Sequence, residues 1–181
     1  MPGPVPPAKP RTGCGARVAG LVVTLVVVAL IAVVRYAINY ATDDGAKAEV
    51  GDCASASQDI GKSAEYEALS CSDPNAVYKV AKVLDNSSGN CPSGDYATYT
   101  VSQRRGPSYR LCLMLNVTEG ECIVQEIVTK NTKKVSCTES GAYEVTKVVS
   151  TSEGDSACGR DDDGYFVYSE PPTTICLAEA S

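Results

Sequence analysis

Histidine and tryptophan are both absent from the 181 residues of this chain, and there is a single phenylalanine. Histidine is the side chain that most often serves as a general base or activates a serine or cysteine nucleophile near neutral pH. It is also the usual partner of cysteine in zinc sites. Its absence excludes histidine-dependent catalysis, and we predict that the protein is not an enzyme.

Acidic residues are absent from the first 42 positions, and the first one is Asp43. Four of the 16 basic residues but none of the 22 acidic residues precede it, so the chain beyond Asp43 is strongly acidic. A surface of this sign repels phosphate groups, which excludes a nucleic acid as a partner. The excess of negative charge otherwise indicates solubility.

One long hydrophobic run separates the basic start from the acidic remainder. Residues 18–34 are apolar apart from one glycine and one threonine, and they lie between Arg17 and Arg35. Together with residues 36–38 the run is long enough to span a bilayer. We predict a transmembrane helix over residues 17–38, with the N-terminus cytoplasmic because the positive charges precede the run. The protein is then a single-pass protein of the cell membrane, with its Cys-rich region extracytoplasmic.

A cleavable signal peptide is the alternative interpretation of this start. Signal peptidase requires small residues just beyond the apolar core, and Asn39 stands where one is expected. The sequence therefore favours an uncleaved anchor. The proline-rich residues 1–16 predict a disordered cytoplasmic tail, and residues 39–49 predict a polar tether.

Cysteine is abundant, and eight of the nine cysteines form two sets in the same order. The first set is Cys53, Cys71, Cys91 and Cys112, and the second is Cys122, Cys137, Cys158 and Cys176. Matched members lie 69, 66, 67 and 64 residues apart. The surrounding residues repeat as well: Gly51-Asp52-Cys53 matches Gly120-Glu121-Cys122, and residues 95–99 match residues 164–168. The chain therefore contains a duplicated module, which we place at residues 50–116 and 117–181.

Disulfide bonds are the expected role of these eight cysteines. There is no Cys-x-x-Cys pair, and spacings of 15 to 21 residues within each set are unlike those of structural zinc sites. We therefore predict neither a metal site nor a cofactor. Bonding within each module leaves nine combinations open. We favour neighbouring pairs, Cys53–Cys71, Cys91–Cys112, Cys122–Cys137 and Cys158–Cys176, because each brackets a loop of hairpin size.

Each module is small and rich in Val, Thr and Tyr, which predicts a mainly β fold, with α+β as the fallback. Strands are expected at residues 76–84, 96–102, 109–117, 122–129, 142–149, 165–168 and 173–178, and one or two helical turns at 57–68. Duplicated halves often pack about a pseudo-twofold axis through equivalent faces. Tyr96, Tyr99, Tyr165 and Tyr168 are the candidates for such an interface or for the core.

Candidate catalytic and metal-binding residues are few. Asp161-Asp162-Asp163-Gly164 is the one acidic run, but it lacks the ligand spacing of an EF-hand loop, so a solvated turn is the favoured interpretation. Asp52 and Glu121 recur at the same position of the repeat, where an acid before a strand is usually a turn residue. Cys14 has no neighbouring base and is interpreted as an ordinary thiol.

Three short patterns recur in both modules: Gly-Asp/Glu-Cys, Ser-Cys followed by Ala-x-Tyr-x-Val, and Leu/Ile-Cys-Leu. In these patterns the chain resembles the LppU-like membrane-anchored or lipid-anchored proteins of actinobacteria. Gly51-Asp52-Cys53 and Leu69-Ser70-Cys71 are also similar to the start of septum-formation-related domains, although this chain lacks the histidine common there. The first resemblance implies an envelope protein and carries over no catalytic or ligand-binding residue. We thus expect a membrane-anchored binding or scaffold protein that recognises a cell-envelope protein or glycan. The alternative is a sensor acting through a cytoplasmic partner.

Overall fold

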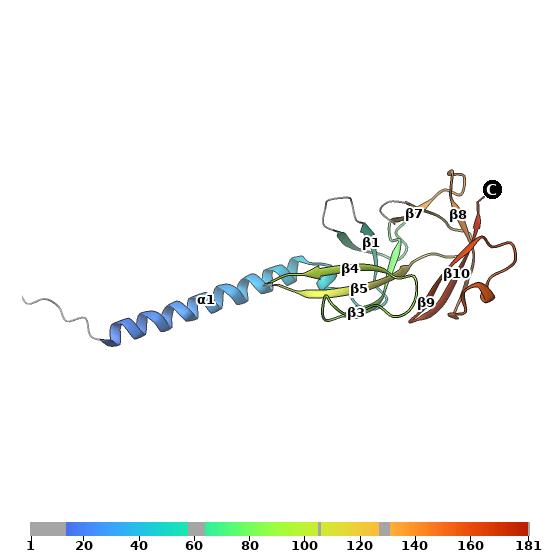
Figure 1. The fold of residues 1–181 in the computed structure, drawn as a ribbon. Coiled ribbons are helices and arrows are strands. Elements are labelled where there is room, and N and C mark those ends of the chain that lie inside the picture. The colour runs from blue at the N-terminus through green and yellow to red at the C-terminus, as the bar shows by residue number, and fades with distance from the viewer. Residues whose placement is uncertain (1–13, 58–63, 105, 127–130, 181) are drawn as a thin grey trace, which may run out of the picture.

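The computed structural model describes residues 14–57, 64–104, 106–126 and 131–180. A long helix leads into two β-sheets that follow one another along the molecule, and the C-terminus lies at the end away from the helix (Figure 1). The helix, α1, runs from Cys14 to Thr42 and is followed by a short 3-10 turn, η1, at Gly45–Lys47.

The large apolar side chains of α1 are exposed from Val22 to Tyr40. They are more than two-fifths accessible at every large aliphatic position described between Val22 and Ile38. Among the described residues, no helix is long and apolar enough to cross a membrane. The predicted transmembrane helix at residues 17–38 is therefore not confirmed by the structure.

The two halves fold into five-stranded antiparallel sheets with the same topology. The first has the order β2-β1-β3-β5-β4, and the second has the corresponding order β7-β6-β8-β10-β9. The strands of the first sheet are β1 Cys53–Ser57, β2 Glu65–Leu69, β3 Tyr78–Leu84, β4 Ala97–Ser102 and β5 Ser108–Leu115. Those of the second are β6 Cys122–Gln125, β7 Thr132–Val135, β8 Tyr143–Val149, β9 Gly164–Ser169 and β10 Pro172–Glu179. The mainly β prediction and the duplication are confirmed.

Every predicted strand has a counterpart, but three strands were missed. These are β1, β2 and β7, which are four or five residues long and carry too many Ala, Ser, Glu or Lys residues to signal a strand. The helical turns expected at 57–68 are wrong where the structure describes this segment, because Glu65–Leu69 pairs antiparallel with β1. Residues 58–63 lie outside the described part.

Strand register corrects the sequence match between residues 95–99 and 164–168. Ala97 lies opposite Leu113 in the first sheet, and Gly164 lies opposite the equivalent Leu177 in the second. The true counterparts are therefore two positions away from the tyrosine match: Thr100 corresponds to Val167, and Ser102 corresponds to Ser169. Shared tyrosine spacing misled the alignment, whereas counting from Cys91 and Cys158 gives the register without a gap.

Four disulfides staple the sheets, and they join the neighbouring cysteines that the sequence favoured. The bonds are Cys53–Cys71, Cys91–Cys112, Cys122–Cys137 and Cys158–Cys176. The first bond of each module ties its first strand to the turn after its second strand. The second bond ties the long connection before the last hairpin to the fully buried Cys112 or Cys176.

The buried core extends across both modules. It joins Leu111, Leu113 and Leu115 of β5 to Tyr168 of β9 and Ile175 of β10. Tyr168 is the largest side chain to be fully buried, and its hydroxyl accepts a hydrogen bond from the backbone N–H of Leu115 (3.2 Å). Residues of both sheets contribute to this one cluster, so the two modules pack against each other.

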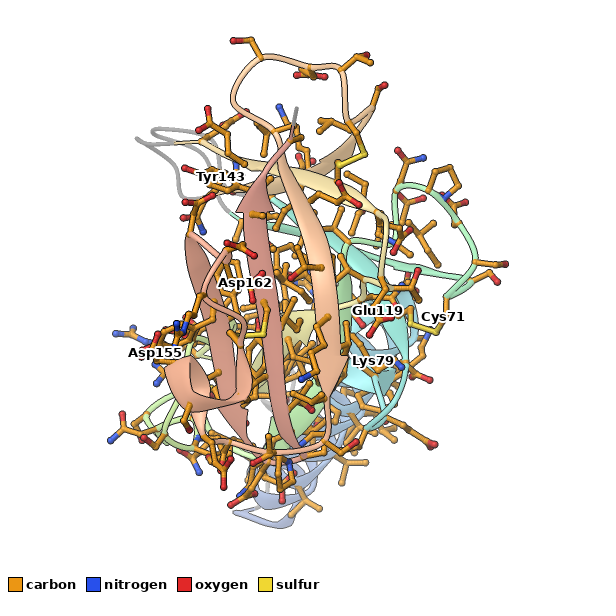
Figure 2. The ribbon with its side chains drawn as sticks, turned by 90° about the vertical axis from the view of Figure 1, so that its right-hand side faces the viewer. Cys71, Lys79, Glu119, Tyr143, Asp155 and Asp162 are labelled. Carbon is orange, nitrogen blue, oxygen red and sulfur yellow. A yellow bond between two sulfur atoms is a disulfide. The ribbon has the colours of Figure 1, made fainter. Side chains whose placement is uncertain are left out.

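The two modules do not bury equivalent faces. Tyr78 is only 5% exposed and accepts a hydrogen bond from the backbone N–H of Thr132, in β7 of the other module. Its counterpart Tyr143 is 41% exposed and stands at the start of β8, the central strand of the second sheet (Figure 2). The expected pseudo-twofold arrangement is wrong, and the contact instead joins one face of the first module to a different face of the second.

Candidate binding cavity beside the helix

An open cavity of about 500 Å³ lies where the chain leaves α1 and enters the first sheet. The segment after the helix contributes Asp43 and Asp44 to its wall. The first sheet supplies the remainder, from β1, β2, β4 and the turn after β4. These lining residues are Ser55, Ser57, Glu65, Tyr66, Glu67, Tyr99 and Gln103.

The wall of the cavity is acidic. Asp43, Asp44, Glu65 and Glu67 place four carboxyl groups around it, and none of the lysines and arginines that the structure describes is part of the lining. Glu65 and Glu67 belong to the edge strand β2 and are exposed. An open wall of one sign raises the local concentration of oppositely charged groups, so the cavity favours positively charged partners.

Three tyrosines form the base of this region. The rings of Tyr66 and Tyr99 have centroids 5.3 Å apart, and those of Tyr99 and Tyr109 have centroids 6.2 Å apart. The Tyr109 hydroxyl donates a hydrogen bond of 2.6 Å to Oδ1 of Asp43. Gly45 packs so closely on Tyr109 that an added Cβ would collide with the phenol oxygen. The segment after the helix is therefore fastened to the first sheet.

Burial and neighbouring acids keep these phenols protonated. Desolvation, followed by the charges of Asp52 and Asp44, raises the pKa of Tyr66 to about 12. Desolvation and the Asp43 carboxylate likewise raise the pKa values of Tyr99 and Tyr109 above their ordinary range. The Tyr66 hydroxyl is buried and has no hydrogen-bond partner among the described residues.

The recurring acids Asp52 and Glu121 cap turns. Oδ2 of Asp52 accepts a hydrogen bond from the backbone N–H of Glu49 (2.8 Å), and Oε2 of Glu121 accepts the equivalent bond from Thr118 (2.6 Å). Glu121 also pairs with Lys134 at 3.0 Å. Although partial burial opposes it, the hydrogen bonds from Lys134 and Thr118 hold the pKa of Glu121 below its ordinary value. These contacts match the turn role that the sequence favoured.

The acidic run Asp161–Asp163 is engaged in backbone and side-chain contacts. Asp162 accepts hydrogen bonds from the Thr146 hydroxyl and the Gly159 N–H, and Asp163 accepts one from the Glu179 N–H. Asp162 lies in front of the second sheet, at the end away from the helix (Figure 2). Within the described residues, one group clusters as metal ligands do, Asp162 with Cys158 and Cys176, but both sulfurs belong to a disulfide.

Sequence reasoning missed the cavity. Asp43 and Asp44 fell within the predicted tether, and Glu65, Tyr66 and Glu67 fell within a segment interpreted as helical turns. The one available signal was the alternation Glu-Tyr-Glu, which has the period of a strand. Which acids meet across the helix exit depends on the docking of that segment against Tyr99 and Tyr109, and this contact has no sequence signature.

No family model, no curated protein and no solved structure matches the chain.

Proposed function

We propose that the protein is a membrane-anchored, extracytoplasmic binding or scaffold protein of the cell envelope. The apolar run at residues 18–34 between two arginines supports an anchor, and the helix α1 covers it. The four disulfides support an oxidising compartment for the sheets. The LppU-like resemblance supports an envelope setting.

The cavity beside the helix exit is the observation that carries the binding role. It is large enough for a small ligand or a side chain of a partner protein, and carboxylates dominate its wall. A partner that presents lysine, arginine or amino groups is therefore favoured over an anionic one. This position, next to the proposed anchor, suits recognition close to the membrane surface.

A sensor is the second candidate, because one contact joins the cavity to the helix. Asp43 lines the cavity and also accepts the Tyr109 hydrogen bond that fixes the helix exit. A ligand that competes for Asp43 would release this contact and alter the position of α1. We infer that such a signal acts through a cytoplasmic partner.

Cross-linking in intact cells, followed by purification of the full chain, tests the proposal. Three variants are compared with the parent: deletion of residues 1–16, the double variant Glu65→Gln with Glu67→Gln, and the control Glu153→Gln outside the cavity. A scaffold retains its extracytoplasmic partners without residues 1–16 and loses them in the double variant. Loss of all partners with the tail would favour the sensor, and unchanged partners in the double variant would exclude the cavity.

A further inference from the structure

The four edge strands of the two sheets are not equally protected. β2 carries Glu65 and Glu67, and β7 carries Lys133 and Lys134, and charged residues discourage pairing at an edge. The edge of β9 is covered by residues 93–95 of the first module. β4, by contrast, has the sequence Ala-Thr-Tyr-Thr-Val-Ser, with no charge, no proline and three β-branched residues.

The cover on β9 shows how an edge of this repeat binds an extended segment. Gly94 bridges to Tyr168 in antiparallel fashion. The Asp95 N–H donates to the Val167 oxygen (2.8 Å), and the Ser169 N–H donates to the Ser93 oxygen (3.2 Å). The Asp95 carboxylate then accepts the Val167 N–H (2.7 Å). Gly94 is required at the centre, because an added Cβ would lie 2.5 Å from the Val167 oxygen.

The backbone groups along the outer edge of β4 are arranged like those along the outer edge of β9. Thr100 and Ser102 hold the positions of Val167 and Ser169 in the shared register, so their backbone N–H and C=O groups point away from β5. Among the residues that the structure describes, none makes a backbone hydrogen bond to this outer edge. Exposed edges of this kind are templates for strand addition.

A groove of about 280 Å³ adjoins the start of β4. Tyr78, Tyr96, Ala97, Tyr99 and Leu113 are part of its lining. Side chains alternate across a paired strand, so every second residue of an added segment faces this groove. Backbone bonds supply affinity in such complexes, and a groove for alternate side chains supplies specificity.

We propose that the β4 edge binds an extended segment of a partner protein by strand addition, as β9 binds residues 93–95 within this chain. The segment has a small residue at the bridging position, followed by a carboxylate that caps an outward N–H group. The groove beside this edge shares Ser57, Glu65 and Tyr99 with the acidic cavity. Thr100 and Ser102 line neither, so protection of their backbone amides reports on strand addition and not on the cavity.

A second copy of the chain does not fit as the occupant. Its residues 93–95 are already paired with its own β9. The counterpart segment at residues 160–162 is tied down too, because Asp162 accepts hydrogen bonds from Thr146 and Gly159. Because both of these segments are engaged within their own chain, we take a segment of a different protein as the occupant.

Hydrogen exchange of the full chain in detergent micelles, with a peptide as probe, tests the proposal. The peptide copies residues 90–96 and carries Cys91→Ser. At saturating peptide we expect the Thr100 and Ser102 amides to exchange at least about fivefold more slowly, because they become hydrogen-bonded. A peptide that also carries Gly94→Val is the matched control, and it should have no effect.

Variants of the edge complete the test. Thr100→Pro removes an outward N–H, and proline is tolerated at edge positions, so peptide protection should vanish while the melting temperature is retained. Thr100→Lys should block pairing in the same way if the proline variant fails to fold. Unchanged exchange of Thr100 and Ser102 with the parent peptide overturns the proposal. So does concentration-dependent protection of β4 without peptide, which would assign the edge to a second copy.

Discussion

Single residues show how the two copies of the repeat diverged. Asp52 and Glu121 perform the same task, since each carboxylate caps the turn before the first strand of its module. Leu115 and Glu179 are also counterparts, but their backbone N–H groups have different partners. Leu115 donates to the Tyr168 hydroxyl of the other module, whereas Glu179 donates to Asp163 of its own. Asp163 thus supplies, within the second module, the acceptor that Leu115 finds in the other module.

The hydrogen bond between Tyr109 and Asp43 is the first contact to remove. Tyr109→Phe should destabilise the sheet region by about 1–3 kcal/mol, because Oδ1 of Asp43 loses the shorter of its two hydrogen bonds and keeps the one from the Ala46 N–H. Thermal unfolding followed by circular dichroism measures the change. Tyr165→Phe is the control, because that side chain is 44% exposed, and it should leave the melting temperature unchanged. Equal effects of the two variants would show that the hydrogen bond contributes nothing.

Ionisation of the Tyr66 phenol should lower the stability of the folded protein at alkaline pH. Its pKa is about 12 in the folded protein against an ordinary value of 10.0, so the folded state retains a proton that the unfolded state releases first. The stabilisation is complete below pH 10 and falls as the pH rises from 10 towards 12. Ultraviolet titration of phenolate should show several late-ionising tyrosines, since the pKa values of Tyr99 and Tyr109 are raised too. Tyr66→Phe should remove one of them. Ionisation of all ten tyrosines near pH 10 would contradict this assignment.

At the scale of elements, the sequence predicted what depends on local pattern. The apolar alternation in residues 76–84 and 142–149 located β3 and β8. Cysteine spacing left nine disulfide combinations open, and the favoured neighbouring pairs are the ones that form. Local pattern did not locate β1, β2 and β7, because these short strands contain few strand-forming side chains. Neighbouring strands and disulfides hold them in place. The acidic cavity was equally hidden, since Glu65 and Asp43 meet only after the helix exit docks.

The disulfides should account for much of the stability of each sheet. Replacing both Cys91 and Cys112 by serine should cost about 3 kcal/mol in the chain-entropy view of a loop of this length, and more because Cys112 is fully buried. Urea unfolding of the variant measures the loss. Cys14→Ser is the control, because this cysteine lies in the helix and outside the two sets. A loss no larger than that of Cys14→Ser would contradict the role assigned to the bond.

The whole molecule is a helix joined to one body of two unequal halves. Tyr96 packs on Tyr168 with ring centroids 5.0 Å apart, and its hydroxyl donates to the Glu170 oxygen. Together with the shared core, this contact makes the modules interdependent. The asymmetry leaves Tyr143 and the β4 edge available on the outside, while their counterparts Tyr78 and β9 are used within the molecule.

The contact between residues 93–95 of the first module and β9 of the second depends on Gly94. Gly94→Val places side-chain atoms against the Val167 backbone at a positive φ, so the bridge to β9 cannot form. We expect a loss of about 2–4 kcal/mol, in the range of severe backbone conflicts, and a single unfolding transition for the parent protein. Gly120→Val is the matched control for the positive φ, because open space surrounds that glycine. A larger loss for Gly120→Val than for Gly94→Val would contradict the interface.

In the proposed arrangement, a disulfide-stapled body lies outside the cell on a membrane anchor. Thiol labelling in intact cells, followed by mass spectrometry of the membrane fraction, tests it most directly. We expect that a membrane-impermeant maleimide labels no cysteine of this chain in intact cells and that lysis exposes Cys14 alone. The other eight cysteines should be found in the four disulfide bonds described. Free thiols among those eight, or a chain recovered in the soluble fraction, would contradict this arrangement.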